Sequence, residues 1–316
     1  MKKEEIIMAF TAADVKKLRE MTGVGMMDCK KALVATEGDM DKAVEWLREK
    51  GLAASQKKAG RIAAEGMAYA EVIDGIGVVV EVNSETDFVA SNEKFIAFTK
   101  GVAKTIAREN PRDLDDLLAK PYDGTDLTVA QQQQEMVLVI GENIKIRRFA
   151  RYSTGVNVAY VHMGGWIGVV VNLDVSDNLK DSPEVAVIGK DVAMQVAALN
   201  APYLDPSSVP ADVIDQEKQI LLAQINDNPK DAAKPDNIKE KMILGKINKF
   251  YKEECLLEQP FVKDDSVSVG KYIANAAKNL GGAVTVKGYT RYEKGEGIEK
   301  KQENYAEEIA SMVNQK

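Results

Sequence analysis

The sequence predicts an α+β fold in which helical modules accompany two related units that contain antiparallel sheets. Three observations support this class: helix-type spacing at the start of the chain, a strand-and-helix pattern that occurs twice, and two amphipathic helices that interrupt the second occurrence. A sheet with one apolar face needs a covering layer, and the helix in each repeat can supply it.

Residues 11–50 have the apolar spacing of three short helices. Gly23 and Gly25 separate the first helix from the second. Gly38 ends the second helix, and Asp39 is a suitable N-terminal cap for the third. The expected buried pairs are Val15 with Leu18, Cys29 with Leu33, and Val44 with Leu47.

We therefore expect a three-helix domain over residues 9–52. The residues that follow, 53–66, are small, basic and weakly apolar, so they predict a linker with some helical character.

One pattern is repeated in the middle of the chain. The segment 76–83 (IGVVVEVN) matches 167–174 (IGVVVNLD) at an offset of 91, and the helical segments 100–107 and 190–197 match at an offset of 90. Each copy has the pattern of a β-hairpin followed by a helix. The repeat predicts two similar α+β subdomains that pack together.

The two copies continue differently. In the first, a helix over 128–141 leads into a strand from Ile144 to Tyr152. In the second, amphipathic stretches over 210–226 and 236–256 predict an inserted antiparallel helical hairpin. Pro229 and Pro235 bracket the turn of this hairpin, because proline does not continue a helix through it.

After the hairpin we expect a helix ending at Gly281, a strand from Ala283 to Arg291, and a last amphipathic helix. Tyr305, Ile309 and Met312 form the apolar stripe of that last helix. The expected divisions are 67–152 for the first subdomain, 153–204 with 258–292 for the second, 205–257 for the hairpin, and 293–316 for a C-terminal module.

Composition restricts the possible functions. The 316 residues are 45% hydrophobic and 29% charged, with a net charge of −7. A protein that binds phosphate backbones needs a basic excess, so nucleic acid is not an expected partner. No apolar run reaches the roughly 18 residues of a membrane helix, and the first residues lack the features of a secretory signal. The isolated Cys29 and Cys255 are typical of a reducing cytoplasm, where we expect the protein to reside.

The sequence also lacks the usual catalytic motifs. It contains no phosphate-binding loop of the GxxxxGK type. Its single histidine, His162, lies in HMGGWIG with no cysteine or acid at ligand spacing, so it is either a structural residue at a turn or a surface contact. We expect no catalytic site, no cofactor and no bound metal.

Three acids gather at the end of the first repeated strand. Glu81, Glu85 and Asp87 share one face if the strand continues that far. Without a basic or histidine partner nearby, catalysis is not favoured, which leaves a solvated strand end or a loop that contacts a partner. The adjacent Phe88 favours the loop, because aromatic side chains are enriched among the anchors of protein interfaces.

The pair Met26–Met27 opens the second helix. Two adjacent methionines cannot both face a small helical core, so we expect one to point outward as an adaptable apolar contact. The alternative is that it packs against the neighbouring domain.

Four stretches of the sequence, in this order, resemble the signatures of the elongation factor Ts family. They are residues 22–33 (TGVGMMDCKKAL), 81–90 (EVNSETDFVA), 141–148 (GENIKIRR) and 295–300 (GEGIEK). The resemblance covers residues 9–316. It implies a three-helix domain of the ubiquitin-associated type, two related α+β subdomains, an inserted helical hairpin that serves in subunit contacts in some members, and a C-terminal helical module.

The resemblance also implies a partner and a mechanism. The partner is elongation factor Tu, bound through its nucleotide-binding domain and beyond, and the assemblies to consider are a homodimer or a 2:2 complex. The segment Thr86, Asp87, Phe88 and Val89 is associated with dislocation of the magnesium ion from that partner. The residues expected to contact the partner are Met26, Met27, Lys30, Ile140, Gly141 and His162.

The function expected from this resemblance is guanine-nucleotide exchange in translation elongation. Phe88 is the candidate wedge that inserts between helices of the partner, and Asp87 is its polar companion. The alternative is a binding module that captures a peptide without promoting exchange, although such a scaffold would not need an exposed Asp-Phe pair.

The chain departs from the family pattern in two places. Trp166 stands where members commonly have a basic residue, which removes a charged contact from that turn. Residues 1–7 precede the usual start of the family. Lys3-Glu4-Glu5 can be encoded by a purine-rich ribosome-binding sequence, so we expect either that Met8 is the natural start or that these residues are an ordinary N-terminal tail.

Overall fold

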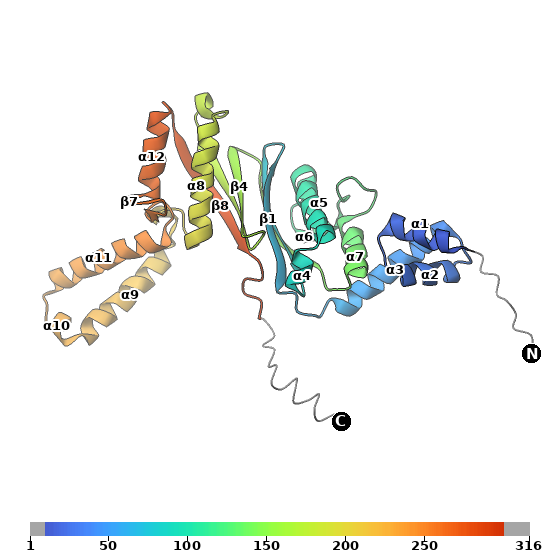
Figure 1. The fold of residues 1–316 in the computed structure, drawn as a ribbon. Helices are drawn as coiled ribbons and strands as arrows, with labels where there is room; N and C mark the ends of the chain where they lie inside the picture. The colour runs from blue at the N-terminus through green and yellow to red at the C-terminus, as the bar shows by residue number, and fades with distance from the viewer. Residues whose placement is uncertain (1–9, 300–316) are drawn as a thin grey trace, which may run out of the picture.

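The structure is a computed structural model that describes residues 10–299. The expectations about Met8 and about the last amphipathic helix concern residues outside this range. Figure 1 shows an extended molecule with a group of helices at one end, a helical hairpin at the other, and the strands between them.

The N-terminal helices have a core of their own. They are α1 (Ala12–Thr22), α2 (Met26–Ala35) and α3 (Met40–Lys58). The side chain of Asp39 caps α3 by accepting from the backbone N–H groups of Asp41 and Lys42, as predicted. The expected buried positions Leu18, Cys29 and Leu33 are fully buried. The third helix is longer than predicted, since α3 continues to Lys58 and so takes up the first part of the expected linker.

The first sheet has three antiparallel strands in the order β1-β2-β3. They are β1 (Glu65–Ile73), β2 (Ile76–Ser84) and β3 (Lys145–Tyr152). The helices of this unit are α4 (Asp87–Ala90), α5 (Glu93–Glu109), α6 (Leu114–Ala119) and α7 (Val129–Ile140). Their apolar faces pack on the sheet around Val80, Phe95 and Val102, all fully buried.

The second sheet is also antiparallel, in the order β4-β5-β8. Its strands are β4 (Val156–His162), β5 (Ile167–Val175) and β8 (Val284–Glu293), covered by α8 (Pro183–Leu199) and α12 (Val269–Asn279). Short elements complete this unit: η1 (Asp177–Leu179), η2 (Pro206–Ser208), β6 (Pro260–Phe261) and β7 (Asp264–Ser268).

The predicted β-hairpin and following helix are present in both copies of the repeat. The two hairpins share one register: Tyr69 pairs with Val80 in the first, and Tyr160 pairs with Val171 in the second. The central strand of each sheet also has an irregularity at the equivalent place, after Glu81 in β2 and after Asn172 in β5. Equivalent sequence positions therefore have equivalent local structure.

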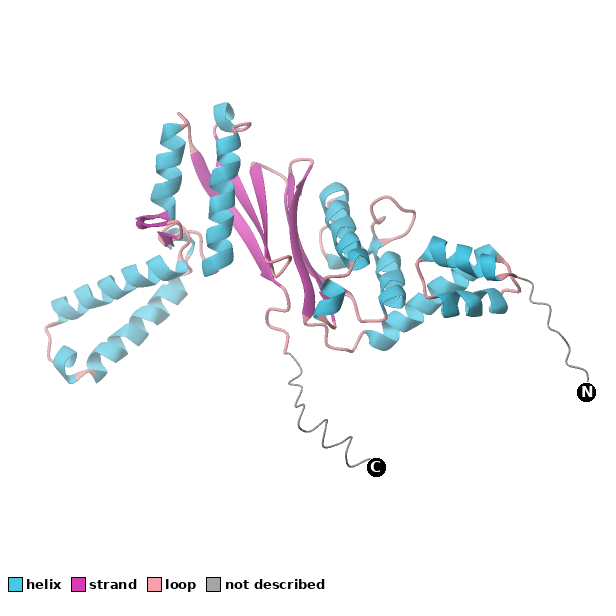
Figure 2. Ribbon diagram, viewed as in Figure 1, coloured by secondary structure: helices cyan, strands magenta, loops and turns pink. Residues whose placement is uncertain are grey.

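The two sheets pack face to face, with the helices on their outer sides, as Figure 2 shows. The core between the sheets is built around the buried Ala70, Val79 and Val170. Gly77 and Gly168 occupy equivalent repeat positions at this interface. A Cβ atom on Gly168 would lie 2.9 Å from the carbonyl oxygen of Ala68. The missing side chain thus allows the sheets to approach closely.

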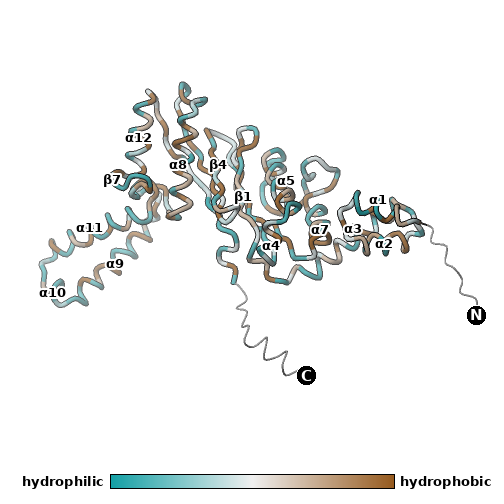
Figure 3. The backbone as a smooth tube through the Cα atoms, in the orientation of Figure 1, coloured by the Kyte–Doolittle hydropathy of each residue, from teal (hydrophilic) through white to brown (hydrophobic). Residues whose placement is uncertain are grey.

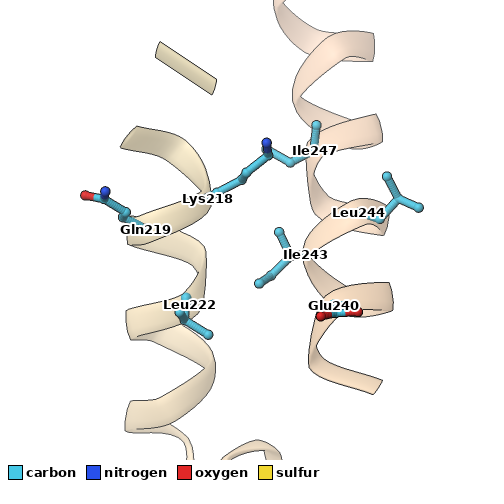
Figure 4. A pocket seen from close by; sticks show the side chains of 7 residues that line it. All are labelled: Lys218, Gln219, Leu222, Glu240, Ile243, Leu244 and Ile247. Carbon is cyan, nitrogen blue, oxygen red and sulfur yellow. The ribbon is translucent and has the colours of Figure 1, made fainter. Parts of the chain in front are cut away.

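The inserted helices form the expected antiparallel hairpin, with α9 (Ala211–Asp227), α10 (Pro229–Ala232) and α11 (Asp236–Glu254). Hydrophobic residues occur along both long helices (Figure 3). Leu221, Ile225 and Ile247 are buried. Beside them lies an open groove of about 370 Å³, shown in Figure 4 and lined by Lys218, Gln219, Leu222, Glu240, Ile243, Leu244 and Ile247.

Within residues 10–299, no helix combines the length and apolar character needed to cross a membrane.

Candidate partner-binding site

The segment Thr86–Val89 forms a short helical turn directly after β2. Phe88 is 85% exposed, whereas its neighbour Val89 is buried against the first core. The next helix, α5, starts at once, because the side chain of Asn92 caps it by accepting from the N–H of Lys94. The buried valine and the capped helix hold the turn in place, so the exposed aromatic ring is presented from a fixed support.

The loop before Phe88 is bonded to the loop that follows α7. The carboxylate of Glu142 accepts from the N–H groups of Glu85 and Thr86, both at 3.0 Å, and from the hydroxyl of Thr86 at 2.7 Å. In return, the carboxylate of Glu85 accepts from the N–H of Asn143 at 2.6 Å. Arg61 lies 3.4 Å from Glu85 and also accepts, through its carbonyl, from the amide of Asn143.

The three acids at the strand end do not form one cluster, and the interpretation of a solvated strand end is wrong for Glu81. Its side chain is fully buried, with guanidinium nitrogens of Arg147 at 3.0 Å and Arg148 at 2.6 Å. The sequence places these cations far from Glu81, but the pairing of β2 with β3 brings them beside it. Glu85 belongs to the loop, and Asp87 is exposed on α4.

The Gly295–Gly297 turn, part of the fourth signature stretch, closes on the same buried carboxylate. The N–H of Gly295 donates to Glu81 at 2.8 Å, and Arg148 also bonds the carboxylate of Glu296 at 2.9 Å. Gly295 has a φ of 71°, and a Cβ atom there would lie 2.0 Å from the carbonyl oxygen of Ala64. Only glycine fits this close approach.

The His162–Trp166 turn between β4 and β5 lies against β1, where the N–H of Ala68 donates to the carbonyl of Gly165 at 2.8 Å. His162 is half-buried, and its Nδ1 is 2.9 Å from the hydroxyl of Tyr160. The histidine therefore has an internal hydrogen-bond partner and is also partly exposed. Met163, at the tip, is 74% exposed.

Trp166 contacts charged residues rather than supplying a charge. Its indole N–H donates to Glu293 at 3.2 Å, and the ammonium of Lys294 lies 4.5 Å from the ring centroid. Hydrogen bonding to the Arg291 guanidinium keeps the pKa of the Glu293 carboxyl below its usual value. Lys294 therefore places a positive charge beside the indole ring, and its ammonium also pairs with Glu65 at 2.6 Å.

The expected outward methionine is present on α2, and its neighbour points outward as well. Met26 is 50% and Met27 is 66% exposed, and Lys30 is also exposed. Cys29 and Leu33 fill the small core instead. Two apolar side chains are therefore available to a partner on this helix.

Ile140 and Gly141 lie where α7 ends. Ile140 is half-buried against the first core, and Gly141 is exposed with a φ of 88° as the C-terminal cap of the helix. This left-handed conformation turns the chain so that Glu142 reaches the Thr86 loop.

One edge of the paired sheets brings together three turns: Thr86–Val89, His162–Trp166 and Gly295–Gly297. β2, β4 and β8 end there, while β1, β3 and β5 begin there, and Figure 1 shows α4 and the end of β8 at this lower edge. The edge carries the exposed Phe88, Met163 and Trp166. Within the described residues no group of three His, Cys, Asp or Glu side chains could hold a metal ion. The arrangement is an edge with exposed apolar side chains held by ion pairs, which we call the contact edge.

Comparison with known proteins identifies the family. A sequence profile described as Elongation factor TS matches residues 85–296. Elongation factor Ts of Clostridium perfringens (strain 13 / Type A) is 48% identical over 307 residues, which cover 96% of this chain and 98% of the relative. The chain belongs to the elongation factor Ts family.

Other elongation factor Ts proteins are similar over equal lengths. That of Syntrophotalea carbinolica is 45% identical over 308 residues, covering 97% of this chain and 100% of the relative. That of Symbiobacterium thermophilum is 47% identical over 312 residues, covering 97% and 99%.

Reasoning from the sequence missed the residues that hold this edge of the elongation factor Ts chain together. Glu142, Arg147 and Arg148 lie inside the recognised GENIKIRR signature, but only its first residue, Gly141, and the preceding Ile140 were expected to contact the partner. The contacts of these residues join segments 56 to 149 positions apart. Their presence in a signature was the available signal, and their partners required the folded structure.

Proposed function

We propose that this protein is a guanine-nucleotide exchange factor for elongation factor Tu in translation elongation, acting in the cytoplasm. The observation that carries the proposal is Phe88, which is 85% exposed on a turn that is anchored on both sides. Leaving a large aromatic side chain in water is unfavourable unless a partner covers it. Membership of the elongation factor Ts family supports the nature of that partner.

The proposed mechanism uses binding energy and makes or breaks no covalent bond. A factor that weakens GDP binding by some ratio is itself bound more weakly by the same ratio when GDP is present. Each tenfold weakening requires about 1.4 kcal/mol. Insertion of Phe88, with Asp87 beside it, would disturb the magnesium and phosphate site of elongation factor Tu. GTP then displaces the factor by mass action.

The other expected contacts extend this surface. Met26, Met27 and Lys30 would form a second contact point on the N-terminal helices, because all three side chains are exposed. Ile140 and Gly141 lie next to the loop that holds Thr86, and His162 lies next to the exposed Met163.

We assign the parts of the chain accordingly. Residues 9–52 are a domain of the ubiquitin-associated type, joined by 53–66 to a core of two subdomains, 67–152 and 153–204 with 258–292. Residues 205–257 form the hairpin, available for subunit contacts in a homodimer or a 2:2 complex, and 293–316 form the C-terminal module. The separate hydrophobic cores of the three helices and of the two sheet units support these divisions.

The direct test is release of a fluorescent GDP analogue from elongation factor Tu. Addition of this protein in catalytic amounts should accelerate release, and excess unlabelled GDP should slow formation of the complex. If the protein binds elongation factor Tu but release stays at its intrinsic rate, the protein is a binding module without exchange activity.

A further inference from the structure

We propose that Glu142 is a positioning residue that fixes the Thr86–Val89 segment before any partner arrives. This inference rests on the proposed function of that segment. Glu142 is 54 residues from Phe88 along the chain on the far side of three helices, yet its carboxylate receives three hydrogen bonds from the loop in front of the phenyl ring.

The hydrogen bonds define the geometry of the loop. One carboxylate oxygen accepts from two successive backbone N–H groups, those of Glu85 and Thr86, each at 3.0 Å. The other oxygen accepts from the Thr86 hydroxyl at 2.7 Å. Hydrogen bonds to an ionised acceptor are stronger than those between neutral groups. Two backbone bonds and one side-chain bond leave the loop little freedom to rotate.

The hydroxyl of Thr86 bonds Glu142 and not the backbone of its own helix. Thr86 occupies the N-terminal cap position of α4, where a threonine hydroxyl normally accepts from a helical N–H. No such bond is present here, and the hydroxyl donates to Glu142. The short helix α4 therefore has no side-chain cap, and Thr86 bonds a distant part of the fold.

The support behind Glu142 is rigid. Gly141 ends α7 with a φ of 88°, and α7 packs closely on α3, where the backbone of Gln134 lies 3.2 Å from the position that a Cβ atom would take on Gly51. A reciprocal bond from the Asn143 N–H to Glu85, at 2.6 Å, ties the same two loops a second time. We call these hydrogen bonds between the two loops the clamp. The clamp connects the segment that carries Phe88 to α7, the helix on which α3 of the N-terminal domain packs.

A clamped loop binds a partner without the entropic cost of ordering it first. Loss of the clamp should therefore raise the concentration of factor needed for half-maximal exchange, because the loop must be ordered during binding. The maximal release rate at saturating factor should change little, since the bound segment regains its position. A higher half-maximal concentration with an unchanged maximal rate distinguishes a positioning residue from one that contacts the nucleotide site directly.

The test compares Glu142→Ala, Glu142→Gln and a matched control, Asp116→Ala. Asp116 also holds a loop by accepting from a backbone N–H, that of Arg112 at 3.0 Å, but it lies on α6 away from the proposed contact edge. Glu142→Ala should raise the half-maximal concentration about tenfold with the maximal rate within twofold. Glu142→Gln, which keeps acceptor oxygen, should recover part of the loss, and Asp116→Ala should match the unaltered protein.

A double variant decides whether Glu142 acts through Phe88. In the Phe88→Ala background, adding Glu142→Ala should cause little further loss, because two residues that act as a unit are not additive. Full additivity, or no effect of Glu142→Ala alone, would overturn the positioning role.

Hydrogen exchange of the free protein provides a readout that does not depend on elongation factor Tu. The amides of Glu85 and Thr86 should exchange faster in Glu142→Ala than in the unaltered protein, and unchanged protection would overturn the clamp. Suppose that Phe88→Ala leaves the nucleotide-exchange activity intact while Glu142→Ala lowers the protection of the two amides. The proposed function of the segment then fails and the clamp stands.

Discussion

At the scale of single residues, the buried carboxylate of Glu81 holds together segments that meet at the contact edge. It accepts from Arg147, Arg148 and the N–H of Gly295, and so connects three of the four signature stretches. A buried charge is expensive unless it is paired and hydrogen-bonded, and here both arginines and Gly295 come from parts of the sequence far from Glu81.

Removal of this carboxylate should strongly destabilise the fold. Glu81→Ala leaves two partly buried guanidinium groups without their partner, and breaking such a pair costs about 3–5 kcal/mol. The free energy of unfolding from urea titration measures this loss. Glu20→Ala removes only an exposed pair with Lys16 and should cause no detectable change. Equal stability of Glu81→Ala and the unaltered protein would show that the network contributes nothing.

Phe88 and its counterpart in the second copy show how similar patterns acquire different roles. At the repeat offset of 91, Leu179 is the equivalent residue, on η1 after β5. Leu179 is only 5% exposed and lies beneath Gly282, where a Cβ atom would meet the leucine side chain at 2.6 Å. One copy of the repeat buries its apolar residue, while the other presents it to solvent.

At the scale of elements, the repeated glycines control how closely the sheets pack. Gly168→Ala would place a Cβ atom 2.9 Å from the backbone of Ala68, so the sheets must separate. We expect a loss of about 1–3 kcal/mol. The same substitution at Gly245, inside α11 with open space around it, should instead raise stability by up to about 1 kcal/mol.

Thermal unfolding of both variants tests this contrast. Opposite signs support close packing of the two sheets through Gly168. A stabilised Gly168→Ala variant would mean that the sheets lie further apart than the structure indicates.

Most of the elements could be predicted from the sequence because their signals are local. Apolar spacing, glycine breaks and caps such as Asp39 gave the helices, and the repeated strand gave both hairpins. The length of α3 was missed because its last turns contain small and basic residues with a weak apolar stripe.

The contact edge could be predicted only in part. Phe88 was recognisable as an aromatic residue beside acids in a loop. The clamp from Glu142 and the burial of Glu81 were not, because both depend on segments that only the tertiary fold brings together.

At the scale of the whole molecule, the proposed contacts span the N-terminal helices and the edge of the sheets. Lys94, just after the Thr86–Val89 segment, donates to the carbonyl of Gly23 at 3.0 Å and so connects the two regions. A partner that touches both Phe88 and α2 would meet a surface that is already assembled.

Charge introduced on α2 tests this extended surface. Met26→Glu or Met27→Glu should weaken the complex with elongation factor Tu by roughly tenfold, since a carboxylate would be buried in an apolar contact. Both side chains are exposed, so melting temperatures should stay the same. Val187→Glu, on the exposed side of α8, is the control and should bind normally. Normal affinity in both methionine variants would place the contact of the N-terminal domain elsewhere.

The most direct measurement of the central claim is the rate at which Phe88→Ala releases a fluorescent GDP analogue from elongation factor Tu, recorded with its melting temperature. The side chain is almost fully exposed, so its loss should leave the fold intact. Truncation of a central aromatic anchor should slow release by roughly 30-fold or more. An unchanged release rate together with a large fall in melting temperature would contradict the account and make Phe88 a structural residue.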